Sequence, residues 1–370
     1  MHRRKFIAAS TQVAAGLAAT IGSAPLTRAA KNATLRLNHN ANPLGIPPLA
    51  REAILEAMED VPHYPGPRRG KLTARLAELH GVDPEQVVLG SGSTEVIRMA
   101  IQAHASAESR IILANPTYEN AIDYSEPYPY VIEKIPLTDD FAHDIERMRR
   151  RAEASSETTV VYICNPNNPT GTLTASSEVD EWIASAPPSV FFIIDEAYFP
   201  FVDHDSYWSA EKWASERPNV VVARTFSKLY GMAGLRLGYG LADAETARRL
   251  KPYANRSNPN TLAMAGGLAA LEEPNWRAKS LSIWRQCREV ITDCLDELGL
   301  HYLPSHTAFL FHEIRGDGDI YIQRMKERDI LVGRPFPPML SFNRLSLSAT
   351  PEELQRFTAT LREFRERGWV

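Results

Sequence analysis

Short apolar runs alternate with longer amphipathic segments through the middle of the chain. The runs are rich in β-branched and aromatic residues and are too short for helices; they lie at 87–89, 110–113, 159–164, 190–194, 220–223 and 237–241. Strands that are apolar almost throughout are typical of sheets covered on both faces, and segments 94–104 and 177–184 predict intervening helices. We therefore expect an α/β fold with a mixed, mostly parallel sheet.

The pattern changes after about Tyr253. Two long helical segments precede two strands there, at 261–271, 275–298, 309–313 and 344–348. The change predicts a large domain over residues 51–255 and a smaller α/β domain over 256–370. Residues 30–50 are rich in Asn and Pro, and we expect this arm to cross to the smaller domain before a helix that starts near Pro48.

The first 29 residues differ from the rest. Arg3, Arg4 and Lys5 precede a small, apolar, acid-free stretch, and Ala29 ends a sequence suited to signal-peptidase cleavage. The paired arginines followed by Phe6 resemble a twin-arginine export signal. We expect a periplasmic protein with no membrane segment after signal removal; the alternative is a basic amphipathic helix on a cytoplasmic protein.

The composition and net charge of the chain indicate which classes of partner it can bind. The chain has 370 residues, of which 44% are hydrophobic and 23% charged, so it is long enough for a globular enzyme of two domains. Its net charge of -4 gives no basic field for nucleic acid or acidic membranes, which favours small-molecule chemistry. Three cysteines without metal-ligand spacing and scattered histidines predict no metal site.

Polar clusters follow several of the predicted strands. They occupy residues 115–118, 165–171, 195–198 and 224–228. Ligands of parallel sheets bind beyond the carboxyl ends of the strands, so these clusters are the candidate site. Asp195 directly follows a buried strand, and a buried acid needs a cationic partner, although a helix N-cap would give the same pattern.

Lys228 stands at another strand end. Thr225 and Ser227 offer hydroxyl donors beside it, and Arg236 offers a charge-assisted fork that suits a phosphate. A desolvated lysine is a good nucleophile, whereas a solvated lysine on a surface turn is the plain alternative. The loop around Asn168 contains two Asn-Pro steps, which predict an extended, turn-rich segment.

These motifs together resemble a known family. Asn-Asn-Pro-Thr-Gly at 167–171, Asp-Glu-Ala-Tyr at 195–198 and Ser227-Lys228 followed by Arg236 are similar, in order and spacing, to fold-type I enzymes that use pyridoxal 5'-phosphate (PLP). The similarity is to class I/II aminotransferases, and within them to the histidinol-phosphate aminotransferases, and it runs from about Leu35 to Leu354. It implies a seven-stranded sheet between helices, a smaller C-terminal α/β domain, and PLP as cofactor.

The resemblance also implies catalytic roles. Lys228 would hold the cofactor as a Schiff base and move the substrate Cα proton, while Asp195 would keep the cofactor's ring nitrogen protonated. Tyr198 and Asn168 would reach its phenolic oxygen, and Tyr118 would stack on its ring.

Other implied contacts concern the phosphate and the oligomer. Ser93 and Thr94 open a helix and resemble the phosphate cradle, to which Thr225, Ser227 and Arg236 would add donors. Tyr64 resembles the tyrosine that reaches the phosphate of the other subunit's cofactor. The expected active unit is therefore a homodimer with shared sites.

For the substrate, Arg344 resembles the arginine that clamps an α-carboxylate, and Asn42 and Gly45 resemble the arm that closes over it. Arg334 would contact a second anionic group or would be a solvated loop arginine. The relatives usually have Asn where Ala308 stands, which weakens any inference about substrate polarity.

The expected reaction is ping-pong transfer of an amino group to a 2-oxo acid from an L-amino acid, or from a similar amine such as histidinol phosphate. Export argues against a cytoplasmic biosynthetic substrate, so the donor stays open. The alternatives are another PLP outcome (lyase, racemase or oxidase) and a non-catalytic periplasmic binding protein. Because Lys228 and Asp195 are both present, the last is disfavoured.

Overall fold

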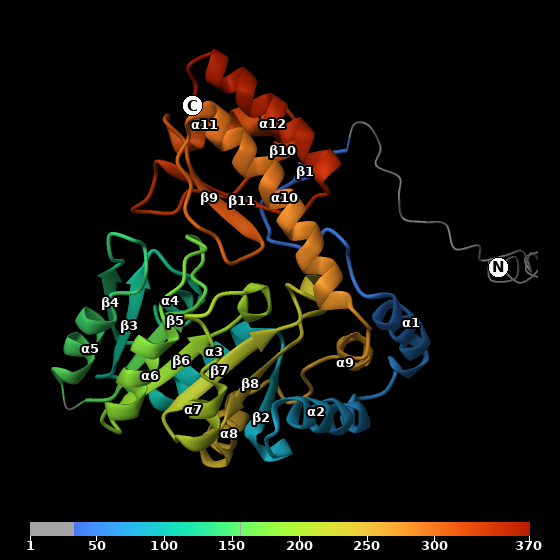
Figure 1. The fold of residues 1–370 in the computed structure, drawn as a ribbon. Coiled ribbons are helices and arrows are strands. Elements are labelled where there is room, and N and C mark those ends of the chain that lie inside the picture. Colours follow the sequence, from blue (N-terminus) through green and yellow to red (C-terminus); the bar gives the residue numbers. More distant parts are fainter. Residues whose placement is uncertain (1–32, 156) are drawn as a thin grey trace, which may run out of the picture. The chain divides into compact units, whose positions relative to one another are not determined.

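Seven strands form the central sheet of the protein (Figure 1). They are β2 (Val87–Gly90), β3 (Arg110–Asn115), β4 (Val131–Pro136), β5 (Thr159–Cys164), β6 (Val190–Asp195), β7 (Val220–Thr225) and β8 (Gly238–Ala242), in the order β2-β8-β7-β6-β5-β3-β4. Strand β8 is antiparallel to both neighbours, and the other pairs are parallel. The predicted mixed, mostly parallel α/β sheet is confirmed. The computed structural model describes residues 33–155 and 157–370, so the predicted export signal lies outside the described residues.

Strand β4 was not among the apolar runs. It lies at the sheet edge, where it pairs only with β3, and of its six residues only Ile135 is buried. An edge strand with one partly solvated face carries polar residues such as Glu133 and Lys134, which hides it from a search for apolar runs.

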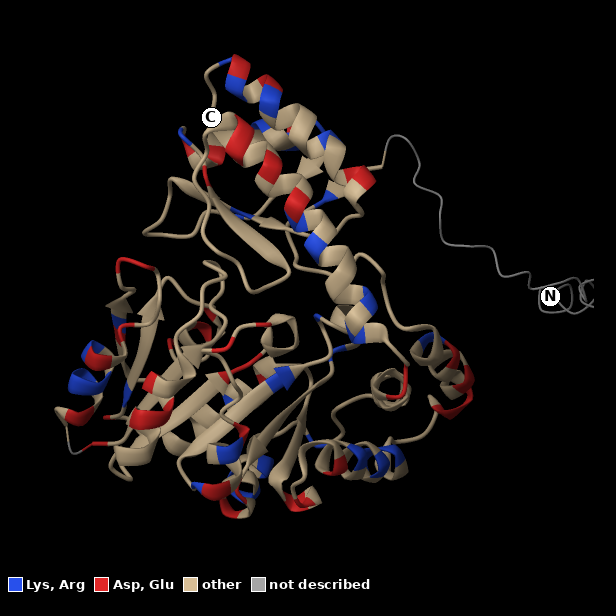
Figure 2. Ribbon diagram, in the orientation of Figure 1, with Lys and Arg blue, Asp and Glu red and all other residues tan. Residues whose placement is uncertain are grey.

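Helices cover both faces of the sheet. Helices α2 (Gly66–His80), α5 (Ile145–Glu153), α6 (Ser176–Ser185), α7 (Glu211–Glu216) and α9 (Thr261–Leu271) share one core with it, together with α1 (Pro48–Glu56). Helices α3 (Ser93–His104), α4 (Asn120–Asp123) and α8 (Ala244–Leu250) share the other. Figure 2 shows few charged residues within the strands, as burial on both faces requires.

Strand alternation decides which side chains meet. Val161 and Phe192 belong to the core on the α6 face, whereas Tyr162 and Ile193 belong to the core on the α3 face. The same period of two places Asp195, at the end of β6, on the side of Tyr162.

The C-terminal part has a separate core. It contains α10 (Trp276–Leu298), α11 (Gly318–Glu327), α12 (Pro351–Glu366), the antiparallel pair β9 (Phe309–Glu313) and β11 (Phe342–Ser346), and β10 (Ile330–Leu331). Strand β1 (Leu35–Arg36) of the N-terminal arm pairs in parallel with β10. Helix α9 packs on α1 and α2 and shares a core with the central sheet, although it lies beyond residue 255. The domain boundaries expected at residues 50 and 255 therefore stay predictions. No described helix is long and apolar enough to span a membrane.

Candidate active site

One cavity collects side chains from the polar ends of β3, β5, β6 and β7 and from the start of α3. Every residue predicted to hold the cofactor lines it except Tyr64. Cys164, Ala197 and Ala233 also line it and were not predicted. The complete lining is Ser93, Thr94, Tyr118, Cys164, Asn168, Asp195, Ala197, Tyr198, Thr225, Ser227, Lys228, Ala233 and Arg236.

One end of the cavity is built to bind an anion. Helix α3 begins at Ser93, and Arg236 Nη2 donates to Thr94 Oγ1 at 3.2 Å beside it. Gly92 precedes the helix with a φ of +84°, and a Cβ there would lie 2.4 Å from Arg236 Nη2, so the guanidinium packs where only glycine leaves room. Ser227 and Thr225 add hydroxyls that bond each other at 2.9 Å. A helix N-terminus, hydroxyl groups and an arginine together fit a phosphate.

At another wall of the cavity lies a buried carboxylate. Asp195 is 1% exposed; its Oδ2 accepts from Tyr162 Oη at 2.8 Å and its Oδ1 from the Ala197 amide at 3.1 Å. Burial raises the pKa of Asp195 to about 6, although these two hydrogen bonds and the charge of Lys228 act against the rise. No salt bridge from a cation in residues 33–155 or 157–370 reaches this carboxylate, so it suits a cationic ring nitrogen supplied by a ligand.

Lys228 follows β7 and also faces the cavity. Its Nζ lies 5.7 Å from the centre of the Tyr198 ring. Burial lowers the pKa of Lys228 to about 8, and the charges of Arg344 and Arg236 act in the same direction against that of Asp195. A lysine in this state is a nucleophile at mild pH. The anion site, the buried acid and this amine together fit PLP, which carries a phosphate, a basic ring nitrogen and an aldehyde.

Two residues of the N-terminal arm support the cavity and were missed in the sequence. Asn40 Nδ2 donates to Tyr198 Oη at 2.9 Å, and the Asn38 carbonyl accepts from Arg344 Nη2 at 3.0 Å. Arg344 Nη1 also donates to Asn168 Oδ1 at 2.8 Å, which leaves the Asn168 amide nitrogen to donate elsewhere. The Asn-rich composition of the arm was the feature of the sequence that could have pointed to them. Each contact, however, joins two residues more than 150 positions apart in the chain.

Arg344 lines a second cavity. Basic and polar side chains share its lining with four aliphatic ones, and no acidic residue lines it: Asn38, His39, Ile322, Lys326, Ile330, Leu331, Val332, Arg334 and Arg344. Arg344 Nε is buried without a hydrogen-bond partner in the described chain. Arg334 is less available, because it forms an ion pair with Glu119.

Three predicted residues lie elsewhere. Tyr64 is 87% exposed and lines a different cavity with Arg68 and Lys71. The Asn42 amide donates to the Leu229 carbonyl at 2.6 Å and so fixes the arm to the loop after Lys228. Gly45 passes against the same loop, since a Cβ at Gly231 would lie 2.0 Å from its carbonyl oxygen.

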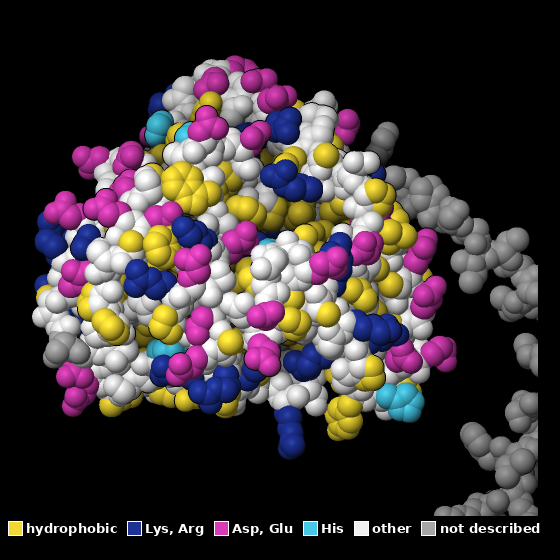
Figure 3. All heavy atoms as spheres, turned by 60° about the horizontal axis from the view of Figure 1, so that its bottom comes forward, with side chains coloured by type: hydrophobic (Ala, Val, Ile, Leu, Met, Phe, Trp, Pro, Cys, Tyr) yellow, Lys and Arg dark blue, Asp and Glu magenta, His cyan; other side chains and the backbone are white. Residues whose placement is uncertain are grey.

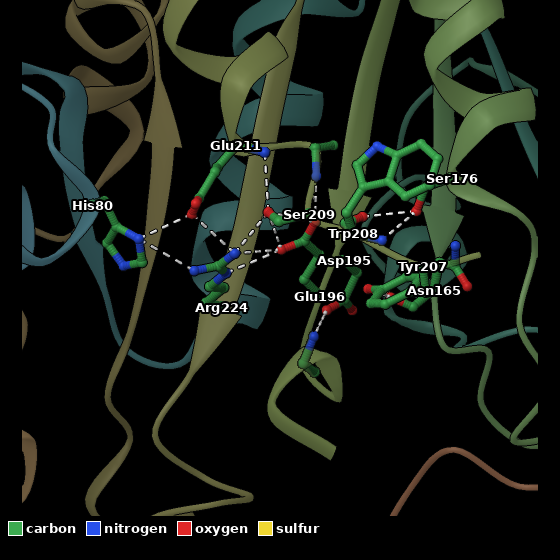
Figure 4. A network of polar contacts seen from close by, with 12 residues as sticks. His80, Asn165, Ser176, Asp195, Glu196, Tyr207, Trp208, Ser209, Glu211 and Arg224 are labelled. Atoms are coloured by element: carbon green, nitrogen blue, oxygen red, sulfur yellow. Dashed lines mark hydrogen bonds and ion pairs between the residues drawn. The ribbon is translucent and has the colours of Figure 1, made fainter. Parts of the chain in front are cut away.

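An ion-pair network lies at the ends of β6 and β7, on the side away from the Asp195 carboxylate (Figure 4). Arg224 at the end of β7 bonds Glu196, which follows Asp195, and also contacts Ser209 and Glu211. His80 Nδ1 lies 3.0 Å from Glu211. Within the described residues, no three His, Cys, Asp or Glu side chains are grouped as a metal ion would need.

Comparisons with known proteins agree on one family. The model of aminotransferase class I and II matches residues 32–361. The chain is 32% identical over 333 residues to the histidinol-phosphate aminotransferase of Brevibacillus brevis, covering 89% of this chain and 90% of that protein. A crystal structure from Erwinia carotovora atroseptica, assigned as a histidinol-phosphate aminotransferase, has a TM-score of 0.89 at 33% identity and covers 91% of this chain and 97% of that one. The histidinol-phosphate aminotransferase of Sinorhizobium meliloti in complex with PLP has the same fold, with a TM-score of 0.84 at 24% identity over 91% of this chain and 92% of that one.

Proposed function

Since the chain belongs to the class I and II aminotransferases and is a PLP-dependent transaminase, we propose that its amino donor is an L-amino acid or a related amine that carries an anionic group. The observation that supports this most is Arg344. Its guanidinium bonds Asn168 in the first cavity, lines the second cavity, which has no acidic residue, and has no carboxylate partner among the described residues. A half-buried arginine without a counter-ion suits a carboxylate or phosphate of the substrate.

The residues of the first cavity have separate tasks in this proposal. Bound PLP supplies an aldehyde for covalent attachment and a ring that accepts electrons. Lys228 Nζ would hold the cofactor covalently and would accept the proton from the substrate Cα. Asp195 would keep the ring nitrogen protonated, and Tyr198 and Asn168 would orient the ring by hydrogen bonds.

The anion site and Tyr118 would fix the cofactor in place. Ser93, Thr94, Ser227 and Arg236 would bind its phosphate, with Thr225 orienting Ser227 through their hydrogen bond. Tyr118 lines the cavity and would pack on the ring. Held in this way, the cofactor would present the substrate Cα to the Lys228 amine.

The donor can be tested by comparing amines with and without an anionic group. The curated relative is named for histidinol phosphate, so L-histidinol phosphate, L-histidinol and L-glutamate are incubated in turn with the loaded enzyme, and the carbonyl products are quantified. We expect the phosphate or the dicarboxylic acid to react and L-histidinol to react at least roughly 10-fold more slowly, since a charge-assisted contact is lost. Equal rates for L-histidinol and for the amines that carry an anionic group would contradict the anion requirement.

We propose a homodimer in which Tyr64 acts on the partner's cofactor. Tyr64 is exposed, and Leu55, Met58 and Val61, which precede it in the chain, are also more than half exposed. Exposed apolar groups of this kind are typical of protein interfaces. Mixing the Tyr64→Ala and Lys228→Ala variants should produce hybrids with one intact site and restore PLP binding and activity; a mixture no better than its components would contradict shared sites.

We propose periplasmic export through the twin-arginine route, with a cytoplasmic protein as the alternative. The support is the sequence of Arg3 and Arg4 before an acid-free apolar stretch. Changing both arginines to lysine should leave the protein in the cytoplasmic fraction. Unchanged fractionation would overturn the proposal.

A further inference from the structure

Tyr162 lies on the strand next to Asp195 and faces the same side of the sheet. Cys164 pairs with Asp195 in the register between β5 and β6, and Tyr162 is two residues before Cys164, so its side chain lies diagonally across from the carboxylate. The Tyr162 hydroxyl donates to Asp195 Oδ2 at 2.8 Å. Both side chains are buried, Tyr162 completely.

The hydroxyl of Tyr162 is a permanent donor. Burial first, and then the nearby charge of Asp195, raises the pKa of Tyr162 well above its usual value, so the phenol stays protonated. Asp195 is its hydrogen-bond partner, and the ring otherwise packs in the apolar core between the sheet and α3. A phenylalanine would fill this core equally well, so the hydroxyl acts on Asp195 and not on packing.

A few neighbouring groups decide whether the Asp195 carboxyl is ionised. Other groups that titrate lie around it. They come from β5, from its own segment, from the loop after β7, from the segment after β3 and from the segment before α7: Tyr162, Cys164, Glu196, Lys228, Tyr118 and Tyr207. Burial and Glu196 disfavour the charged carboxylate, whereas Tyr162, the Ala197 amide and Lys228 favour it. Of these groups, the Tyr162 hydroxyl and the Ala197 amide bond the carboxylate directly.

We propose that Tyr162 is a positioning residue that keeps Asp195 ionised and fixes its carboxylate toward the cofactor ring nitrogen. The inference deepens the proposed role of Asp195 and rests on it. The Ala197 amide holds Oδ1 and the Tyr162 hydroxyl holds Oδ2, so the carboxylate plane is set from both sides. Tyr162 acts through Asp195 and does not touch the reacting atoms.

The test is PLP binding to the apoenzyme across pH, with Tyr162→Phe as the variant. The matched control is Tyr321→Phe, since the Tyr321 hydroxyl is buried in the C-terminal core without a hydrogen-bond partner in the described residues. We expect Tyr162→Phe to weaken PLP binding roughly 10-fold, as for loss of a hydrogen bond to a charged group. As pH is lowered, the affinity of Tyr162→Phe for PLP should also begin to fall at a higher pH than that of the wild type. The reason is that Asp195 takes up a proton more readily without the Tyr162 hydroxyl. The phosphate of PLP and Lys228 titrate in both proteins and cancel in the comparison.

A second comparison separates this role from a purely structural one. In an Asp195→Asn background, Tyr162→Phe should change neither affinity nor its pH dependence, because no ionised carboxylate is present. Wild-type affinity and pH midpoint in Tyr162→Phe, or an equal loss at every pH, would overturn the proposal for Tyr162 alone. If Asp195→Asn bound PLP like the wild type at every pH, the role of Asp195 itself would fail, and the role of Tyr162 with it.

Discussion

Arg224 donates from Nε and Nη2 to one oxygen of Glu196, at 3.0 and 2.7 Å. Both side chains are buried, and they stand at the ends of the adjacent strands β7 and β6. Glu196 follows Asp195 directly, and Arg224 precedes Lys228 by four residues. The ion pair therefore ties together the two strand ends that carry the cavity's acid and its amine.

Removing one partner of this pair should destabilise the fold. In Arg224→Met the Glu196 carboxylate keeps donors from Ser209 and from the Ala210 amide but loses the one cation that pairs with it among the described residues, so we expect the free energy of unfolding to fall by about 3–5 kcal/mol. Urea denaturation measures the change. The double variant Arg224→Met with Glu196→Gln should recover much of the loss, and a double variant no more stable than Arg224→Met would contradict this explanation.

The pH dependence of cofactor capture should report Lys228. Because burial lowers its pKa to about 8 from an ordinary 10.5, the rate at which the apoenzyme attaches PLP covalently should rise with pH and reach half its maximum near pH 8. Stopped-flow absorbance measures the rate. A midpoint near the ordinary lysine value would contradict the desolvated geometry.

The lowered pKa of Lys228 also makes the stability of the apoenzyme depend on pH. Between pH 8 and 10.5 the unfolded chain binds more protons at Lys228 than the folded apoenzyme does, so this group makes the apoenzyme more stable as pH rises through that window. The Lys228→Ala apoenzyme should lack this contribution, which urea denaturation at several pH values can detect. Parallel pH profiles for the two proteins would contradict it.

Arg344 should govern substrate affinity. Replacing it with lysine removes the bidentate fork but keeps a charge, and we expect kcat/KM to fall roughly 10- to 100-fold, mainly through KM. Arg334→Lys serves as the matched control, because Arg334 is already paired with Glu119 and should matter less. Steady-state kinetics with the best donor measure both, and an equal effect from the two changes would contradict the assignment.

The sequence predicted the fold well where strands are buried. Runs such as 159–164 and 190–194 are apolar on both faces, and the structure has β5 over the predicted residues and β6 with only Asp195 added. Strand β4 was missed because its exposed edge carries Glu133 and Lys134.

Acidic and basic side chains are interspersed over the face seen in Figure 3, so that face presents no surface of one charge.

The candidate site was predictable only as far as its motifs. Lys228, Asp195, Asn168 and Arg236 stand in recognisable strings, and the structure brings them to one cavity. Tyr162 lies inside an apolar strand, and only the register between β5 and β6 shows that it meets Asp195. Such contacts depend on three-dimensional pairing that a single sequence does not contain.

The central claim is that Lys228 holds PLP in this cavity for transamination. The most direct measurement is the near-ultraviolet and visible absorption spectrum of the purified protein with PLP, before and after amino acids are added, beside that of Lys228→Ala. We expect a band of lysine-bound cofactor that is absent in Lys228→Ala and that particular amino acids convert to the band of pyridoxamine phosphate. A wild-type protein that shows no such band after PLP addition, or a band that survives in Lys228→Ala, would contradict the account.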